Sequence, residues 1–115
     1  STYMVWSLVK NKFSNMKSCI FLNTRDDRIY RTIQLLELIF NSINPDFIII
    51  RSDGIQKHID KFDVDYSRVK VFSMEVNQSE IVQKILKLNG YFVLGIGNMV
   101  GWGEDFINQI KEYEL

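Results

Sequence analysis

The sequence contains no alanine, and it has only one cysteine, one histidine and one proline among its 115 residues. A single cysteine excludes a disulfide framework and a multi-cysteine zinc site. Cys19 lies in the apolar run 18–22, which is typical of a small core residue in a reducing, cytosolic protein. The lone His58 has no evident nucleophilic partner, so we expect a surface residue and no catalytic triad.

The sequence also lacks an excess of charge of one sign and has no long hydrophobic run. The 14 basic and 14 acidic residues cancel, so a globally basic nucleic-acid binder is excluded. No apolar run reaches the roughly 18 residues that a transmembrane helix needs. Hydrophobic residues make up 46% and charged residues 24%, as in a globular domain. Because the chain begins with Ser1, we expect residues 1–115 to form a single domain of a longer multidomain protein.

Short apolar runs alternate with amphipathic segments along the chain. We expect strands at 18–22, 47–50, 69–72 and 91–96, with helices at 3–13, 28–42, the short stretch from 55, the stretch after Asn77, and the C-terminal end. The residues expected to face the core are Val5, Leu8, Val9 and Phe13 in the first helix, Ile29, Ile33, Leu36 and Phe40 in the second, and Phe106, Ile107, Ile110 and Tyr113 in the last.

Continuous apolar strands are typical of a parallel sheet that is buried on both faces. The sequence therefore predicts an α/β fold, a three-layer Rossmann-like domain whose mainly parallel four-stranded sheet has the order 3-2-1-4. This order creates a topological switch point between strands 1 and 4, where ligands bind in such sheets. The loops 23–28 and 95–98 would meet there.

The first of these loops concentrates positive charge. Arg25, Arg28 and Arg31 lie within one short span, and the last two share a face of the first helical turn. Cations are unfavourable at a helix N-terminus by about 0.3–1 kcal/mol each, which marks a candidate functional site. Next to the exposed backbone N–H groups of the helix N-terminus, the three arginines would bind a carboxylate or a phosphate. The alternative is that Asp26 and Asp27 merely neutralise them on the surface.

The second loop is rich in glycine. Gly95, Gly97 and Asn98 follow a strand and precede a helix, where glycine lets a ligand approach the backbone. The pattern is neither a dinucleotide fingerprint nor a phosphate-binding GxxxxGK[ST] loop, and a purely structural turn is the alternative. We expect the turn to extend to Gly103, with Trp102 as a candidate pocket wall.

Together the two loops resemble a known family. The string Asn23-x-Arg25-x-Asp27-Arg28-x-x-Arg31-Thr32, paired with Gly95-x-Gly97-Asn98, is similar to the C-terminal domain of the poly-γ-glutamate synthase ligase subunit. This family makes bacterial capsule polymer and is the capsule-synthesis branch of the Mur ligase superfamily. The resemblance covers nearly the whole chain, although Asp26 stands where the family has proline and residues 51–80 carry no matching motif.

The resemblance implies the C-terminal domain of an ATP-dependent amide ligase that joins glutamate units through an acyl phosphate. ATP and Mg²⁺ would be bound mostly by a central domain, whose ATP loop is absent here, so this chain alone would be inactive and holds no metal of its own. The three arginines would hold an α-carboxylate or phosphate. Asn23 and Asn98 would orient polar groups, and Asp27 would position an arginine or cap the helix.

The resemblance also implies partners: glutamate or the polyglutamate chain, the central ATPase domain, and membrane-bound synthase subunits at the cytoplasmic face of the membrane. Two alternatives stay open at this point. One is a non-catalytic regulatory module of the same fold that binds an anion or nucleotide, and the other is a protein-interaction domain with a structural arginine loop.

Overall fold

Four parallel strands form the centre of the computed structural model, which describes residues 2–25, 27–98 and 101–111. The strands are β1 (Lys17–Asn23), β2 (Phe47–Arg51), β3 (Val69–Phe72) and β4 (Tyr91–Gly97). Their order is β3-β2-β1-β4 and every pairing is parallel, which confirms the predicted order and places the switch point between β1 and β4.

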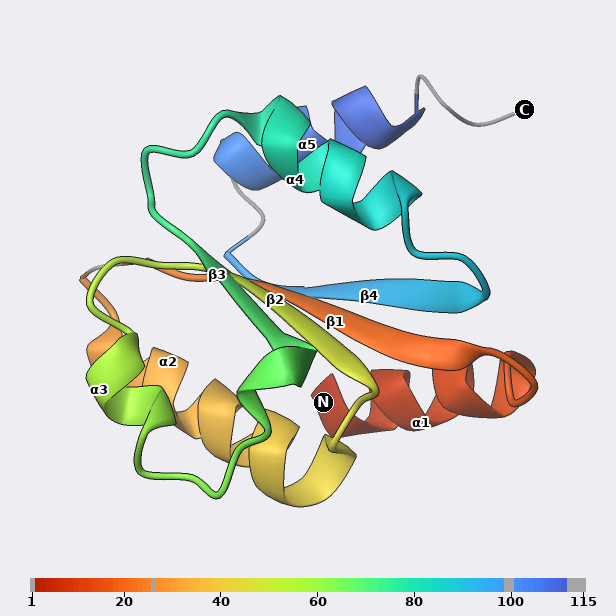
Figure 1. Ribbon diagram of the computed structural model, residues 1–115, viewed down its shortest axis with the longest axis horizontal. Coiled ribbons are helices and arrows are strands. Elements are labelled where there is room, and N and C mark those ends of the chain that lie inside the picture. Colours follow the sequence, from red (N-terminus) through yellow and green to blue (C-terminus); the bar gives the residue numbers. More distant parts are fainter. Residues whose placement is uncertain (1, 26, 99–100, 112–115) are drawn as a thin grey trace.

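Helices cover both faces of this sheet (Figure 1). On one face lie α1 (Thr2–Lys12), α2 (Ile29–Glu37) with its π-helical continuation η1 (Leu38–Ile43), and α3 (Gln56–Ile59). On the other lie α4 (Gln78–Leu86) and α5 (Trp102–Lys111), and a 3₁₀ turn, η2 (Tyr66–Arg68), precedes β3. The three-layer prediction is therefore correct.

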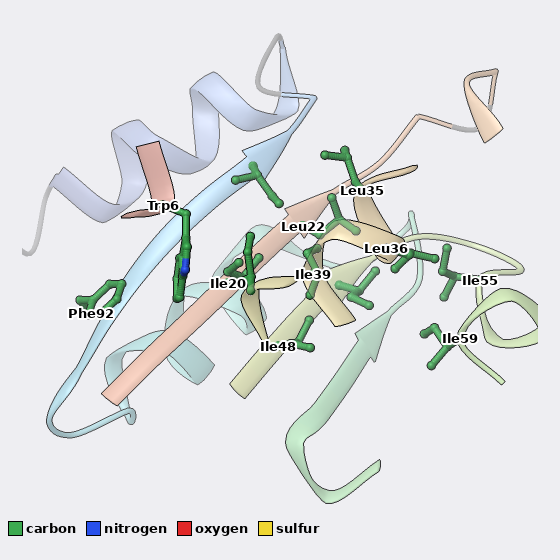
Figure 2. Packing of buried hydrophobic residues seen from close by; sticks show 13 residues of the cluster. Trp6, Ile20, Leu22, Leu35, Leu36, Ile39, Ile48, Ile55, Ile59 and Phe92 are labelled. Atoms are coloured by element: carbon green, nitrogen blue, oxygen red, sulfur yellow. The ribbon is translucent and has the colours of Figure 1, made fainter. Parts of the chain in front are cut away.

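The larger core lies between the sheet and α1, α2 and α3 (Figure 2). The even-numbered residues of β1 and β2 point into it, as the alternation of side chains along a strand requires. Trp6 is the buried residue of α1, and its ring centre lies 5.7 Å from that of Phe92. The predicted inner face of this helix is partly wrong, because Val5 and Leu8 are exposed. Trp6 and the partly buried Val9 and Phe13 make the contact with the core.

The face predicted for the second helix is correct in part, because Leu36 is fully buried and Phe40 packs against the core. Ile29 is exposed, and the buried positions of α2 are Thr32, Leu35 and Leu36. Leu36 belongs to both sets, so the buried face overlaps the predicted one and is rotated from it toward Thr32 and Leu35. The predicted end before Pro45 is correct, and Asn44 closes η1 in the left-handed conformation.

The second core lies between the sheet and α4 and α5. It includes Cys19, which is fully buried as predicted, and Phe21, whose ring lies 4.8 Å from that of Phe106. Phe106 is buried as expected. The side chains of Ile107 and Ile110, and all of Tyr113, lie outside the described part of the chain.

The predicted burial of the strands on both faces holds only for β1 and β2. The edge strands β3 and β4 are partly exposed, because each has a neighbour on one side only. Within the described ranges, no helix combines the length and the hydrophobicity needed to cross a membrane.

Candidate functional site

A cleft of about 790 Å³ opens at the carboxyl end of the sheet, between the β1–α2 loop and the end of β4. We call it the switch-point cleft. It is lined by Thr2, Val5, Asn23, Thr24, Arg25, Arg28, Arg31, Thr32, Leu35, Leu94, Gly95, Ile96, Gly97 and Asn98. The structure thus brings together all the site residues predicted from the sequence except Asp27. The two loops are far apart in sequence and meet because β1 and β4 are neighbours.

Gly97 allows the closest approach between these loops. It lies opposite Asn23 in the β1–β4 pairing and has a φ of +98°, a conformation that side chains rarely adopt. A Cβ atom at this position would lie 2.1 Å from the carbonyl oxygen of Asn23. The backbone geometry at the end of β4 therefore requires glycine.

The side chain of Asn23 joins the two loops directly. It is fully buried, and its Nδ2 donates to the carbonyl oxygen of Asn98 at 2.6 Å. The backbone N–H of Asn98 in turn donates to the carbonyl oxygen of Asn23 at 2.8 Å. These two bonds, which we call the Asn23–Asn98 pair, fix the separation between the loops.

Arg25 and Asp27 form an exposed ion pair within the β1–α2 loop. Two parallel hydrogen bonds of 3.0 and 2.8 Å join the guanidinium to the carboxylate. Asp27 lies outside the cleft lining, and it neutralises much of the charge that Arg25 brings to the cleft. For Arg25 alone, the prediction that neighbouring acids neutralise the arginines is therefore correct; Asp26 lies outside the described residues.

Arg28 and Arg31 differ from Arg25 in this respect. Both side chains are exposed and line the cleft, and neither has a hydrogen-bond or ion-pair partner among the described residues. Arg28 is the N-cap residue of α2 without a side-chain cap, and the first turn of this helix contains no acidic residue. The first N–H groups of a helix lack intrahelical partners and carry partial positive charge. Two cations and a helix N-terminus thus face the same cleft.

The lining of the cleft also includes apolar side chains. Val5 from α1, Leu35 from α2, and Leu94 and Ile96 from β4 contribute to the lining, together with the buried hydroxyl residue Thr32. The arrangement suits a ligand that has an anionic group and an aliphatic or aromatic part.

Sequence reasoning missed Arg51, the last residue of β2. It is only 8% exposed, and its Nη1 donates to Oδ1 of Asn23 at 2.9 Å. Its carbonyl oxygen accepts bonds from both the N–H and the hydroxyl of Thr24. The sequence does contain one indication of this role: Arg51 directly follows a run of three isoleucines that are buried in β2, and it pairs with Asn23 of β1.

Trp102 does not line the cleft, so the prediction that it forms a pocket wall is wrong. It is the first residue of α5, and its ring stacks on Phe106 at 5.3 Å in the second core. The predicted glycine turn is also too long, because Gly103 is a buried residue of α5.

The donor set of the cleft fits an anion better than a divalent cation. Guanidinium and N–H groups are donors, whereas Mg²⁺ requires oxygen ligands. In residues 2–25, 27–98 and 101–111, no three His, Cys, Asp or Glu side chains come together to hold a metal ion. The donors of this lining suit the oxygen atoms of a carboxylate or a phosphate group.

Fold and cleft together define a class: parallel α/β domains with an arginine-lined cleft at the switch point. The chain belongs to the family of poly-γ-glutamate synthase CapB C-terminal domains, whose family model matches residues 1–113. This match confirms the family resemblance seen in the two loops and supports a role in poly-γ-glutamate synthesis. No curated protein and no solved structure matches the chain.

Proposed function

We propose that this chain is the ligand-holding C-terminal domain of an ATP-dependent amide ligase of the Mur ligase superfamily, and that its switch-point cleft binds the anionic group of a reactant in poly-γ-glutamate synthesis. The observation that carries the proposal is the pair Arg28 and Arg31, which face the cleft without a partner among the described residues. The family match supports the same role, because both reactants of such a synthase are carboxylates.

The chemistry limits what this domain does. In the proposed reaction ATP phosphorylates a glutamate side-chain carboxylate and leaves as ADP, and the amine of the next glutamate displaces the phosphate. The described residues offer no phosphate-binding lysine loop and no group of three or more His, Cys, Asp or Glu side chains that could hold a metal ion for this step. The contribution of this chain is therefore binding and orientation: its arginines hold an α-carboxylate or phosphate while a central ATPase domain supplies the activated group.

The magnitude of this contribution follows from the charge of the contacts. A hydrogen bond to a charged group contributes about 1.5–3 kcal/mol, which corresponds to roughly a 10- to 150-fold change in binding. Two such contacts would let the domain select a carboxylate-bearing reactant and keep it aligned when the domain closes over the active site. Positioning of this kind lowers the activation barrier without any proton transfer by the domain.

The test is the rate of glutamate incorporation by a synthase that carries this domain. We expect the double substitution Arg28→Ala and Arg31→Ala to reduce kcat/KM for glutamate or for ATP by about 100-fold or more, as the loss of two charged contacts predicts. The matched control is Lys87→Ala, which removes an exposed cation at the end of α4, on the opposite face of the sheet. Full activity in the double variant would refute the proposal and leave the regulatory and interaction-domain alternatives.

The regulatory alternative is distinguished in the same assay. If the cleft only senses an anion or nucleotide, the double variant will lose regulation by that ligand while the uninhibited rate at saturating substrate stays normal. The ligase proposal predicts a loss that persists in the absence of any added effector.

A further inference from the structure

One buried side chain connects the carboxyl ends of all four strands. Arg51 ends β2, its Nη1 binds Asn23 at the end of β1, and its Nη2 donates to the carbonyl oxygen of Met74, just after β3, at 2.7 Å. Through Asn23 it also reaches Asn98, just after β4. Its guanidinium carbon lies 4.1 Å from the centre of the Trp102 ring, at the start of α5. Arg51 itself is not among the residues that line the switch-point cleft.

The chemistry of Arg51 fixes the orientation of the Asn23 amide. An amide can present either its oxygen or its nitrogen to a neighbour, whereas a guanidinium has donors only. Arg51 therefore requires Oδ1 of Asn23 on its side, which leaves Nδ2 to donate to Asn98. Without Arg51, only the Asn98 carbonyl would select this orientation, and the buried Oδ1 of Asn23 would lose its hydrogen-bond donor.

We infer that Arg51 is a positioning residue for the switch-point cleft, acting through the Asn23–Asn98 pair, and that its stacking on Trp102 links the cleft to α5. The inference rests on the proposed function, in that the cleft must bind an anion. Arg51 holds the Asn23 amide in place, and this amide in turn holds the backbone at Asn98, after the end of β4. The position of Asn98 then sets the distance between residues 95–98 and the side chains of Arg28 and Arg31. A change in cleft occupancy would then reach Trp102, which does not line the cleft itself.

Lysine is the informative substitution at this position. It keeps the positive charge, but a single ammonium group cannot bridge two acceptors in a planar fork and stack flat on an indole. If Arg51 acts through Asn23, the substitutions Arg51→Lys and Asn23→Ala remove the same interaction, and their effects on ligand affinity will not add. A merely structural role would lower stability and leave the ligand affinity of the folded Arg51→Lys variant unchanged.

The first experiment is a calorimetric titration of the chain with inorganic pyrophosphate. We expect Arg51→Lys to weaken binding about tenfold, and the double variant Arg51→Lys, Asn23→Ala to bind no more weakly than Asn23→Ala alone. Lys87→Ala should leave the affinity unchanged. Unchanged affinity in Arg51→Lys, or additive losses in the double variant, would overturn the inference.

The second experiment needs no substitution and so does not depend on the folding of a variant. Pyrophosphate should shift the indole N–H resonance of Trp102 in the unmodified chain, while the indole of Trp6, which packs on Phe92 near the start of β4, stays in place. Shifts at the Arg28 and Arg31 amides with a stationary Trp102 would overturn the inference alone. Absence of any shift at those amides with pyrophosphate and with glutamate alike would overturn the proposed function and the inference with it.

Discussion

Gly97 offers the sharpest test of how the cleft is built, through the substitution Gly97→Ala. The new Cβ would meet the carbonyl oxygen of Asn23 at 2.1 Å, a contact with backbone that no side-chain rotation relieves. The ends of β1 and β4 must therefore separate by about an ångström, which breaks the two hydrogen bonds of the Asn23–Asn98 pair.

The expected cost has two parts. A non-glycine residue in a disfavoured backbone region costs about 1–3 kcal/mol. The loss of two hydrogen bonds adds about 1 kcal/mol each, so the total is about 3–5 kcal/mol of a stability that is typically about 5–15 kcal/mol for a domain. Gly90→Ala is the matched control, because Gly90 also has a positive φ, +77°, but a Cβ added there would meet nothing within 4 Å. Gly90→Ala should therefore carry only the backbone cost of a non-glycine residue at positive φ, without the loss of hydrogen bonds.

The assay is urea unfolding followed by circular dichroism, with the free energy of unfolding extrapolated to water for both variants and the unmodified chain. We expect Gly97→Ala to lose about 2 kcal/mol more than Gly90→Ala, the amount assigned to the two hydrogen bonds. Equal losses in the two variants would show that β1 and β4 tolerate separation at this point, and would refute the account of a fixed cleft width.

Three further predictions concern single side chains. Burial raises the pKa of the Cys19 thiol to about 12, so a thiol reagent at mildly alkaline pH should label Cys19 only after the chain unfolds; labelling within minutes in the native state would contradict this. Asp27→Asn should release Arg25 and strengthen pyrophosphate binding by about two- to fivefold, since exposed ion pairs contribute up to about 1 kcal/mol, and weaker binding would argue against Arg25 as a ligand. Hydrogen bonds from the backbone N–H and hydroxyl of Ser18 lower the pKa of Asp46, so this pair stabilises the fold above the ordinary carboxyl pKa and its contribution is lost as the pH falls below that value; Asp46→Ala should flatten the acid limb of the stability profile, and an unchanged limb would contradict the assignment.

The sheet could be predicted from the sequence because its signal is local and strong. Four apolar runs alternating with amphipathic segments permit few topologies, and the predicted order holds. The helix faces were harder. In α1 and α2 the predicted apolar faces overlap the buried ones only in part, because the buried face depends on how each helix packs against the sheet. Val5 and Ile29 are exposed for this reason.

The candidate site, too, could be predicted from the sequence only in part. The loops of the switch point could be placed together from the strand order, since parallel neighbours end at one edge of the sheet. Arg51 could not be found in this way, because its role depends on contacts with Asn23, Met74 and Trp102, which are distant in sequence and come together only in the fold. Local composition identifies charged groups at a loop, but it does not show which buried groups hold that loop in place.

The net charge of the chain does not describe the charge of its cleft. The 14 basic and 14 acidic residues cancel over the chain, yet Arg28 and Arg31 face the cleft, and Asp27 of the same loop contacts Arg25 instead. Placement matters more than the total, because exposed charges are screened within about 8 Å at physiological ionic strength. A neutral domain can therefore present a cationic site.

Anion binding at the switch-point cleft is tested most directly by an amide chemical-shift titration of the chain with glutamate and, separately, with ATP. Binding at the switch-point cleft predicts shifts at residues 25 and 27–32 and at 95–98, and their loss when Arg28 and Arg31 are both replaced by alanine. Shifts confined to residues 51–68, or an unchanged response in the double variant, would contradict the claim that this cleft holds the anionic reactant.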